Sequence, residues 1–283
     1  MTSFILPKGN VQIAFSGGRT SGYMLYKILE ANNGLPDTAK VIFTNTGREM
    51  PETYDFIQEC SNRWNVNITW LEYEKKPNEK VGYNIVNHNS ASRKGEPFDC
   101  LINYSKRLPN VYQRFCTQEL KVKTVRRYLV RELKWKKWST AIGIRSDETH
   151  RAKHKGDSKE TEWYPIIPNN ISQRDIISFW KQQNFDLKVT KGFGNCDGCF
   201  LKSEKTLAVL WRMHPERAEW WSKQEHKVFP GKDPQKQIMQ TFKKQINNGN
   251  SYSELGDLVS RQGDWIFDQE DYFCQANDGE CTG

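Results

Sequence analysis

The chain has 283 residues, of which 36% are hydrophobic and 27% charged, a balance typical of a globular protein with a sizeable core. No apolar run is long enough to predict a membrane-spanning helix, and no secretory signal opens the sequence, so we expect a cytoplasmic protein without a membrane partner. The formal net charge of +8 favours anionic ligands, from a nucleotide to a nucleic acid, although a generally basic surface would give the same charge.

The first predicted element is a strand at residues 11–15 that turns into a helix through a segment rich in small residues. The residues of this turn are Ser16, Gly17, Gly18, Arg19, Thr20 and Ser21. Such a turn leaves backbone N–H groups at the positive end of a helix dipole and is therefore a candidate anion site. The glycines allow close approach of a phosphate, and the hydroxyl groups add donors. An ordinary strand-to-helix connection is the alternative, and no Lys closes the turn as in the Gly-x-x-x-x-Gly-Lys motif.

Further strands are predicted at residues 39–46, 66–73 and 138–144, with a helix that begins near Pro51 between the first two. This alternation indicates a parallel sheet with right-handed crossovers, in which ligands bind beyond the carboxyl ends of the strands. We therefore predict an α/β fold: a doubly wound, mostly parallel sheet with helices on both faces. The turn at residues 16–21 and the loop after the second strand would lie at one edge of it.

The remaining segments are predicted more coarsely. Residues 74–97 read as a long polar loop and residues 149–162 as a flexible flap. A helix is expected to begin at residues 170–172, and a helical region interrupted by proline covers residues 204–246. The tail at residues 274–283 is polar and expected to be loose. We divide the chain into a sheet domain, residues 1–205, and a helical C-terminal extension with a loose tail, residues 206–283.

Seven cysteines, an odd number, favour metal binding or catalysis in a reducing compartment over a disulfide framework. Cys196 and Cys199 have the spacing that lets two thiolates reach one metal centre. Cys116 precedes a predicted helix and lies near Lys121, and both features stabilise a thiolate. The pattern alone leaves zinc, an iron–sulfur cluster, a redox dithiol and no functional role open.

Arg145 directly follows the strand predicted at residues 138–144, where Gly143 also lies. An arginine at the carboxyl end of a sheet strand can bind phosphate or sulfate through its planar fork.

These motifs occur in the order found in the phosphoadenosine phosphosulfate (PAPS) reductase family, which the chain resembles over roughly residues 10–205. The matching segments are Ser16-Gly17-Gly18, Phe43 to Gly47, Cys116 with Lys121, Gly143 to Glu148, Tyr164-Pro165-Ile166 and Cys196 to Cys199. The family belongs to the adenine nucleotide alpha-hydrolase (PP-loop ATP pyrophosphatase) superfamily. Thr20 stands where the superfamily loop Ser-Gly-Gly-x-Asp-Ser has Asp, a departure that preserves phosphate binding and argues against metal-assisted pyrophosphate chemistry.

The resemblance implies an adenine nucleotide ligand: ATP, adenylyl sulfate (APS) or PAPS. Its phosphates or sulfate would lie on residues 16–21 and on Arg145, and its adenosine near a second loop. The residues of that loop are Thr44, Asn45, Thr46 and Gly47.

The resemblance also implies a [4Fe–4S] cluster, with zinc as the alternative. Its ligands would be Cys116, Cys196 and Cys199, with Cys100 as a candidate fourth. Cluster-bearing members have a tandem Cys-Cys, whereas Phe115 precedes Cys116 here.

Cys281 and Arg145 are the candidate catalytic residues, with Cys281 as the nucleophile. Family reductases end in Glu-Cys-Gly-x-His, whose Cys attacks the sulfate sulfur. This chain ends in Glu-Cys-Thr-Gly, without the His. A loose tail thiol is the alternative for Cys281.

Three functions remain in competition. The first is reduction of APS or PAPS to sulfite with an external thiol donor such as thioredoxin. The second is an ATP-using sulfurtransferase that thiolates tRNA or DNA, which the positive charge would suit. The third is a nucleotide-binding regulator without turnover. The order of the motifs favours the reductase.

Overall fold

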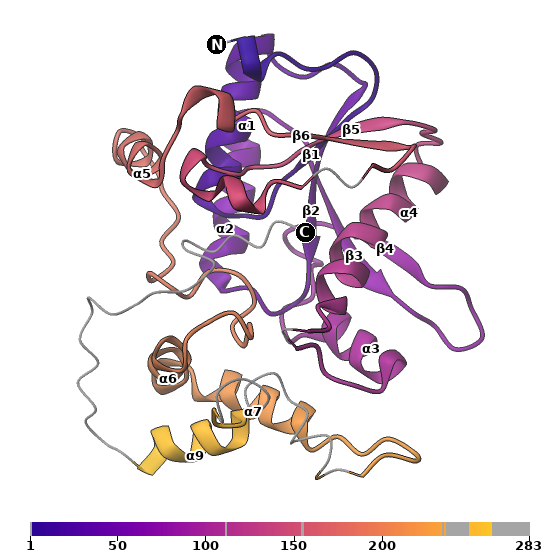
Figure 1. Cartoon of the computed structure of the whole chain (residues 1–283), viewed down its shortest axis with the longest axis vertical. Helices are drawn as coiled ribbons and strands as arrows, with labels where there is room; N and C mark the ends of the chain where they lie inside the picture. The colour runs from indigo at the N-terminus through magenta and orange to yellow at the C-terminus, as the bar shows by residue number, and fades with distance from the viewer. Residues whose placement is uncertain (1, 111, 154–155, 234, 236–248, 262–283) are drawn as a thin grey trace.

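The structure is a computed structural model of the chain and describes all residues except 1, 111, 154–155, 234, 236–248 and 262–283. Figure 1 shows a sheet flanked by helices, with the helices of the C-terminal region below it. The strands are β1 (Val11–Ala14), β2 (Ala39–Asn45), β3 (Ile68–Glu74), β4 (Gly82–Val86), β5 (Trp138–Ala141) and β6 (Glu160–Trp163). The α-helices are α1 (Arg19–Asn32), α2 (Pro51–Arg63), α3 (Glu96–Ser105), α4 (Lys123–Arg131), α5 (Gln173–Lys181), α6 (Glu204–Met213), α7 (Pro215–Glu225) and α9 (Tyr252–Arg261). Short helices are η1 (Thr2–Phe4), η2 (Thr117–Val122, a π-helix), η3 (Ser146–Arg151) and η4 (Ile167–Asn169).

The six strands form one sheet in the order β4-β3-β2-β1-β5-β6, and only β4 pairs antiparallel to its neighbour. The chain runs from β1 through β2 to β3 and then returns to β5 on the other side of β1. This reversal places the switch point of the sheet between β1 and β5, where ligands of doubly wound sheets bind. The predicted α/β fold with a mostly parallel sheet is confirmed.

The strand residues alternate between two cores, which explains why helices cover both faces (Figure 1). Val11, Ile13 and Phe43 face the larger core, which α1, α2 and α5 complete. Ile42 and Leu71 face a smaller core on the side of α4. Successive strand residues point to opposite faces, so short apolar runs such as β1 can be buried on both sides.

A second large core lies beyond the sheet and joins the C-terminal helices to the rest of the molecule. Trp211 of α6, Trp221 of α7 and Tyr252 of α9 pack there together with Leu101 of α3 and Phe193. Residues from both sides of position 205 therefore share this core. The tail at residues 274–283 lies outside the described residues.

Two sequence predictions are wrong in detail. Residues 74–97 were expected to form a loop but contain β4 and the start of α3, and the end of the predicted flap at residues 149–162 contains β6. Both strands lie at edges of the sheet, where one side carries no partner strand from the part of the chain that the structure describes, so they need little apolar sequence. Pro97 occupies the first turn of α3, a position that suits proline because its missing N–H has no helical partner.

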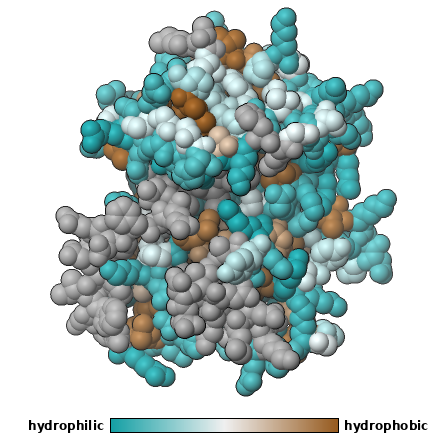
Figure 2. Space-filling model, in the orientation of Figure 1, coloured by the Kyte–Doolittle hydropathy of each residue, from teal (hydrophilic) through white to brown (hydrophobic). Residues whose placement is uncertain are grey.

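The surface is mostly hydrophilic, as expected for a chain in which 27% of the residues are charged. Figure 2 shows a mostly hydrophilic face on which hydrophobic residues form small, separate patches. No helix of the described residues is long and apolar enough to cross a membrane.

A close approach within the larger core gives a stability prediction. A Cβ added at Gly22 of α1 would lie 2.7 Å from Cζ2 of Trp180, whose indole is held by a 2.8 Å hydrogen bond from Nε1 to the Arg19 carbonyl. We expect Gly22→Ala to destabilise the fold by about 1–3 kcal/mol, because the ring must shift in a packed core. Gly256→Ala in α9 is the matched control, since its Cβ would meet nothing closer than 4.0 Å. Thermal unfolding followed by circular dichroism compares the two, and equal stability would contradict this packing.

Candidate active site

The turn after β1 has the form of an anion site. Gly17 has φ +80°, and a Cβ there would lie 2.7 Å from Thr53 of α2, so only glycine fits without strain. Inside the turn, the Ser21 hydroxyl accepts a hydrogen bond from Ser16 N at 3.2 Å and donates to the Gly18 carbonyl at 2.9 Å. These contacts hold the N-terminus of α1 beside the switch point.

The two arginines predicted to bind the anion differ in their surroundings. Arg19 donates to both carboxylate oxygens of Asp186, at 2.7 and 2.9 Å, so its charge is directed to the segment after α5. Arg145 is 2% exposed and lies at the turn, with Nη1 3.5 Å from Thr20 Oγ1. Asp147 and Glu148 pair with its guanidinium at 3.0 Å.

A cavity of about 100 Å³ begins at this turn and runs between the sheet and α4; we call it the sheet cavity. Ser16, Ser21 and Gly143 line it on the side of the turn. Apolar side chains such as Ile42 and Leu129 form walls above and below. Hydrogen-bond donors suited to a phosphate, placed at one end of an apolar cavity, are the arrangement expected for a nucleotide site.

The loop at residues 44–47 lies between the sheet cavity and a second cavity. Thr44 lines the sheet cavity and Thr46 lines the second one. Asn45 is buried between them, donates to Glu72 Oε1 at 2.6 Å, and accepts from Gly47 N at 2.9 Å. Asn45 and Gly47 therefore hold the shape of the loop.

Three predicted metal ligands line that second cavity, which we call the cysteine cavity. It measures about 30 Å³, and Cys116, Cys196 and Cys199 contribute to its wall. Lys121, in the π-helical segment η2, lines both the sheet cavity and the cysteine cavity. Irregular helical segments of this kind occur often at functional sites.

The fourth predicted ligand lies elsewhere. Cys100 lines a separate open hollow with Lys75, Lys94 and Trp220, and its thiol contacts the Lys75 carbonyl at 3.6 Å. Among the described residues, no three His, Cys, Asp or Glu side chains converge closely enough to hold a metal ion.

The Cys196 thiol is in a mixed electrostatic environment. Burial raises its pKa, and Glu49 and Cys116 act in the same direction, whereas Lys121 and the 3.2 Å contact with Thr46 Oγ1 lower it. Burial is the largest of these effects, so the pKa of the Cys196 thiol lies above its usual value.

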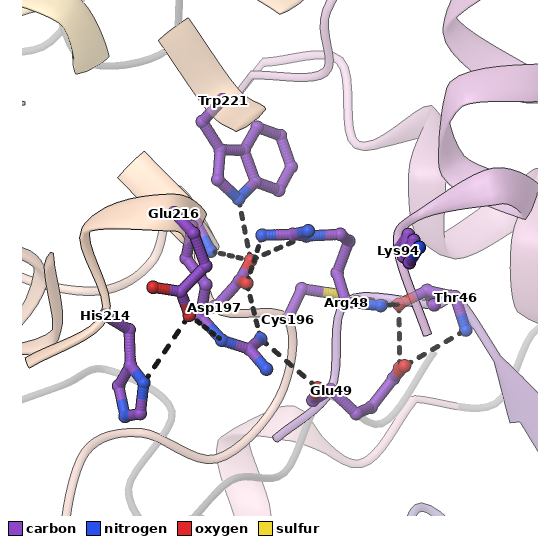
Figure 3. Close-up of polar contacts among 12 residues, drawn as sticks. Thr46, Arg48, Glu49, Lys94, Cys196, Asp197, His214, Glu216 and Trp221 are labelled. Atoms are coloured by element: carbon purple, nitrogen blue, oxygen red, sulfur yellow. Dashed lines mark hydrogen bonds and ion pairs between the residues drawn. The ribbon is translucent and has the colours of Figure 1, made fainter. Parts of the chain in front are cut away.

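A buried ion cluster holds the cysteine loop in place (Figure 3). Asp197 has no exposed surface and accepts hydrogen bonds from Arg48, from Arg217 Nη1 at 2.6 Å and from Trp221 Nε1 at 2.7 Å. Arg48 also stacks over the Trp220 ring at 4.4 Å. The loop after β2, the Cys-x-x-Cys segment and α7 thus meet at one carboxylate.

No motif predicts this cluster from the sequence. Arg48 and Arg217 stand 169 positions apart, and neither belongs to a recognisable pattern. The sequence feature that could have indicated the ion cluster is Asp197, an acidic residue between two candidate ligand cysteines. Cys281, the predicted nucleophile, lies outside the described residues.

Comparison with known proteins identifies relatives of the sheet region. The model of the phosphoadenosine phosphosulfate reductase domain matches residues 10–189. A protein of Escherichia phage lambda described as "uncharacterized nin region protein ORF290" is 30% identical over 201 residues, which cover 70% of this chain and 68% of that protein.

Two named reductases are also similar. Phosphoadenosine 5'-phosphosulfate reductase of Aliivibrio fischeri is 32% identical over 71 residues, which cover 25% of this chain and 26% of that enzyme. The crystal structure of PAPS reductase from Candida auris, a phosphate complex, aligns with a TM-score of 0.41 and 16% identity, covering 63% of this chain and 74% of that one.

The ion cluster predicts a large effect of one isosteric change. Asp197→Asn removes the charge that the buried Arg48 and the partly buried Arg217 share, and leaving them uncompensated should destabilise the fold by about 3–5 kcal/mol. Glu59→Gln is the matched control, because it removes the exposed Glu59–Arg63 pair in α2 and should cost about 0.3–0.5 kcal/mol. Urea unfolding followed by tryptophan fluorescence measures both, and a small loss for Asp197→Asn would contradict the role given to the cluster.

Proposed function

Because this chain belongs to the phosphoadenosine phosphosulfate reductase domain family, we propose that it binds an adenine nucleotide and reduces an adenylyl sulfate, APS or PAPS, to sulfite. The observation that carries the proposal is the position of Lys121, which lines both the sheet cavity and the cysteine cavity. A nucleotide in the first cavity would have its anionic end beside the thiols of the second. Sulfur chemistry on a nucleotide needs this proximity.

The residues where the sheet cavity and the cysteine cavity meet would have different roles. The backbone of residues 16–21 would bind the phosphates, and Arg145 would orient the sulfate from its place against Thr20. Lys121 would supply positive charge between the leaving phosphate and the thiols, where charge develops as the sulfur–oxygen bond breaks.

The thiol step uses a nucleophile from the tail. The Cys281 thiolate would attack the sulfur, displacing AMP or its 3′-phosphate and leaving an S-sulfonated cysteine. A dithiol such as thioredoxin would then attack Cys281 Sγ, release sulfite, free the Cys281 thiol and become a disulfide.

Thiols line the cysteine cavity, and thiols are the donor type that soft metals prefer. The three thiols do not converge closely enough to hold a metal ion in this arrangement, so Cys116, Cys196 and Cys199 would have to move together to hold a [4Fe–4S] cluster or a zinc ion, and thiolates are the preferred ligands of both. When bound, a cluster would supply polarisable iron–sulfur chemistry near the proposed nucleotide site. Ligation requires the thiolate, so binding would release the proton that burial keeps on Cys196.

The nucleophile is tested by Cys281→Ser. We expect this variant to lose sulfite release from APS and PAPS by at least about 10³-fold, because a hydroxyl is a far weaker nucleophile than a thiolate. Cys274→Ser, the other cysteine of the same segment, is the control and should retain activity. Full activity of Cys281→Ser would remove Cys281 from the mechanism. Pyrophosphate release from ATP that tRNA or DNA stimulates would instead establish the sulfurtransferase.

The metal is tested by anaerobic purification with iron, zinc and sulfide analysis. We expect brown protein with about four irons and four sulfides per chain. Cys196→Ser should lose the metal, whereas Cys100→Ser should keep it, because Cys100 lines a different hollow. Colourless protein with one zinc would overturn the cluster, and loss of metal in Cys100→Ser would return Cys100 to the ligand set.

A further inference from the structure

The strand β4 ends the sheet on one side and has an uncharged, partly apolar sequence. No strand of the described residues pairs with its outer side. Residues 81–92 contain no Asp, Glu, Lys or Arg, although 27% of the whole chain is charged. Within this stretch, the Ile85 side chain is 55% exposed. Figure 1 shows the hairpin of β3 and β4 reaching outward beside α4, so this edge of the sheet is open to a further strand.

The opposite edge of the sheet is protected against strand addition. There β6 carries two carboxylates in four residues, Glu160 and Glu162, and Glu162 is only 7% exposed. Charged side chains on an edge strand, above all those that point inward, prevent pairing with another chain, because pairing would desolvate them. The sequence of β4 contains no such residue. An uncharged edge with an exposed β-branched side chain is a template for strand pairing.

The sequence of β4 is complementary to itself in one antiparallel register. When Asn84 of one copy lies opposite Asn84 of another, all five residues of both strands are paired. Gly82 then lies opposite Val86, and Tyr83 lies opposite Ile85. Opposed residues share a face of the sheet, so the Tyr83 ring of each copy would cover the exposed Ile85 of the other. Pairs of an aromatic and a β-branched residue stabilise antiparallel strands.

The charges that flank β4 favour the same register. Lys80 is exposed and precedes the first residue of β4 by two positions. In the antiparallel pair it would lie opposite position 88 of the second copy. There His88 Nε2 lies 2.8 Å from Asp55 Oδ1, and the Asp55 side chain is 71% exposed. A two-fold axis would make this contact twice, with Lys80 of each copy facing Asp55 of the other.

We infer that β4 joins two copies of this chain into a two-fold symmetric dimer, in which the six strands of each copy form one continuous sheet. Each copy offers β4 once, so the assembly closes at two copies and does not grow into a fibre. The contact uses one short strand from each copy and belongs to the class of small, weak interfaces. We therefore expect a dissociation constant of about 1–100 µM. The inference is independent of the proposed function.

Sedimentation velocity of the full-length protein between about 1 and 500 µM tests the dimer, and the monomer should convert to a dimer within this range. Ile85→Lys places a charge on the edge strand and should weaken the dimer at least about tenfold. Ile177→Lys in α5 is the matched control, because Ile177 is also exposed, at 38%, and lies away from β4; it should leave the dimer unchanged. Thermal unfolding followed by circular dichroism checks that both variants are folded.

Charge reversal tests the register. Lys80→Glu and Asp55→Lys, each alone, bring like charges together and should weaken the dimer at least about threefold at low salt. The two changes combined restore opposite charges and should restore the dimer. Single changes without effect, or a double variant no better than the single ones, would overturn this register.

A cysteine on the two-fold axis gives a covalent readout. Directly opposed Cα atoms of antiparallel strands lie about 4.5–5.5 Å apart, a distance that a disulfide spans. Asn84→Cys should therefore form a disulfide-linked dimer under mild oxidation, beyond what the native cysteines of the unaltered protein and of the control Ile177→Cys give on non-reducing gels. A monomer at every concentration, a dimer that Ile85→Lys leaves intact, or Asn84→Cys without added crosslinking would overturn the inference.

Discussion

The position of the candidate active site depends on a single buried charge, the carboxylate of Asp197. A carboxylate without exposed surface must be compensated, and Asp197 accepts from Arg48, Arg217 and Trp221. Arg48 comes from the loop after β2, whereas Arg217 and Trp221 both come from α7, so satisfying this one group brings the Cys-x-x-Cys segment to the carboxyl edge of the sheet (Figure 3). The C-terminal helices are thereby part of the site's scaffold.

The cysteine loop that Asp197 holds in place also contacts the loop after β2. Once Asp197 fixes the cysteine loop, Cys196 lies 3.2 Å from Thr46 Oγ1, and Thr46 belongs to the loop that also places Thr44 in the sheet cavity. Lys121 completes the junction from the other side. The switch point of the sheet explains the phosphate end of the site, and the ion cluster explains the thiol end.

The sequence predicts those parts of the molecule whose signal is local. Composition and hydrophobic period predict the buried strands β1, β2 and β3, the small-residue turn at residues 16–21 and the helix α5. Edge strands such as β4 and β6 do not, because pairing on one side only leaves them polar.

Side-chain direction explains the remaining differences at the site. Arg19 and Asn45 have the residue types of ligand-binding groups, and in the structure they contact Asp186 and Glu72. The family resemblance makes Cys100 a candidate fourth ligand, whereas the fold places it in a separate hollow. Residue type limits what a position can do, and only the packed structure decides which neighbours it meets.

The distribution of charge at the anion site follows from the same physics. Arg145 is almost fully buried, and an unpaired guanidinium there would be costly before any ligand arrives, so Asp147 and Glu148 compensate it. The turn at residues 16–21 therefore contributes neutral N–H and hydroxyl donors, which are strong next to a helix N-terminus and need no counter-ion. Such a site gains specificity from geometry more than affinity from net charge. A net charge of +8 favours anions in general and does not determine which one fits.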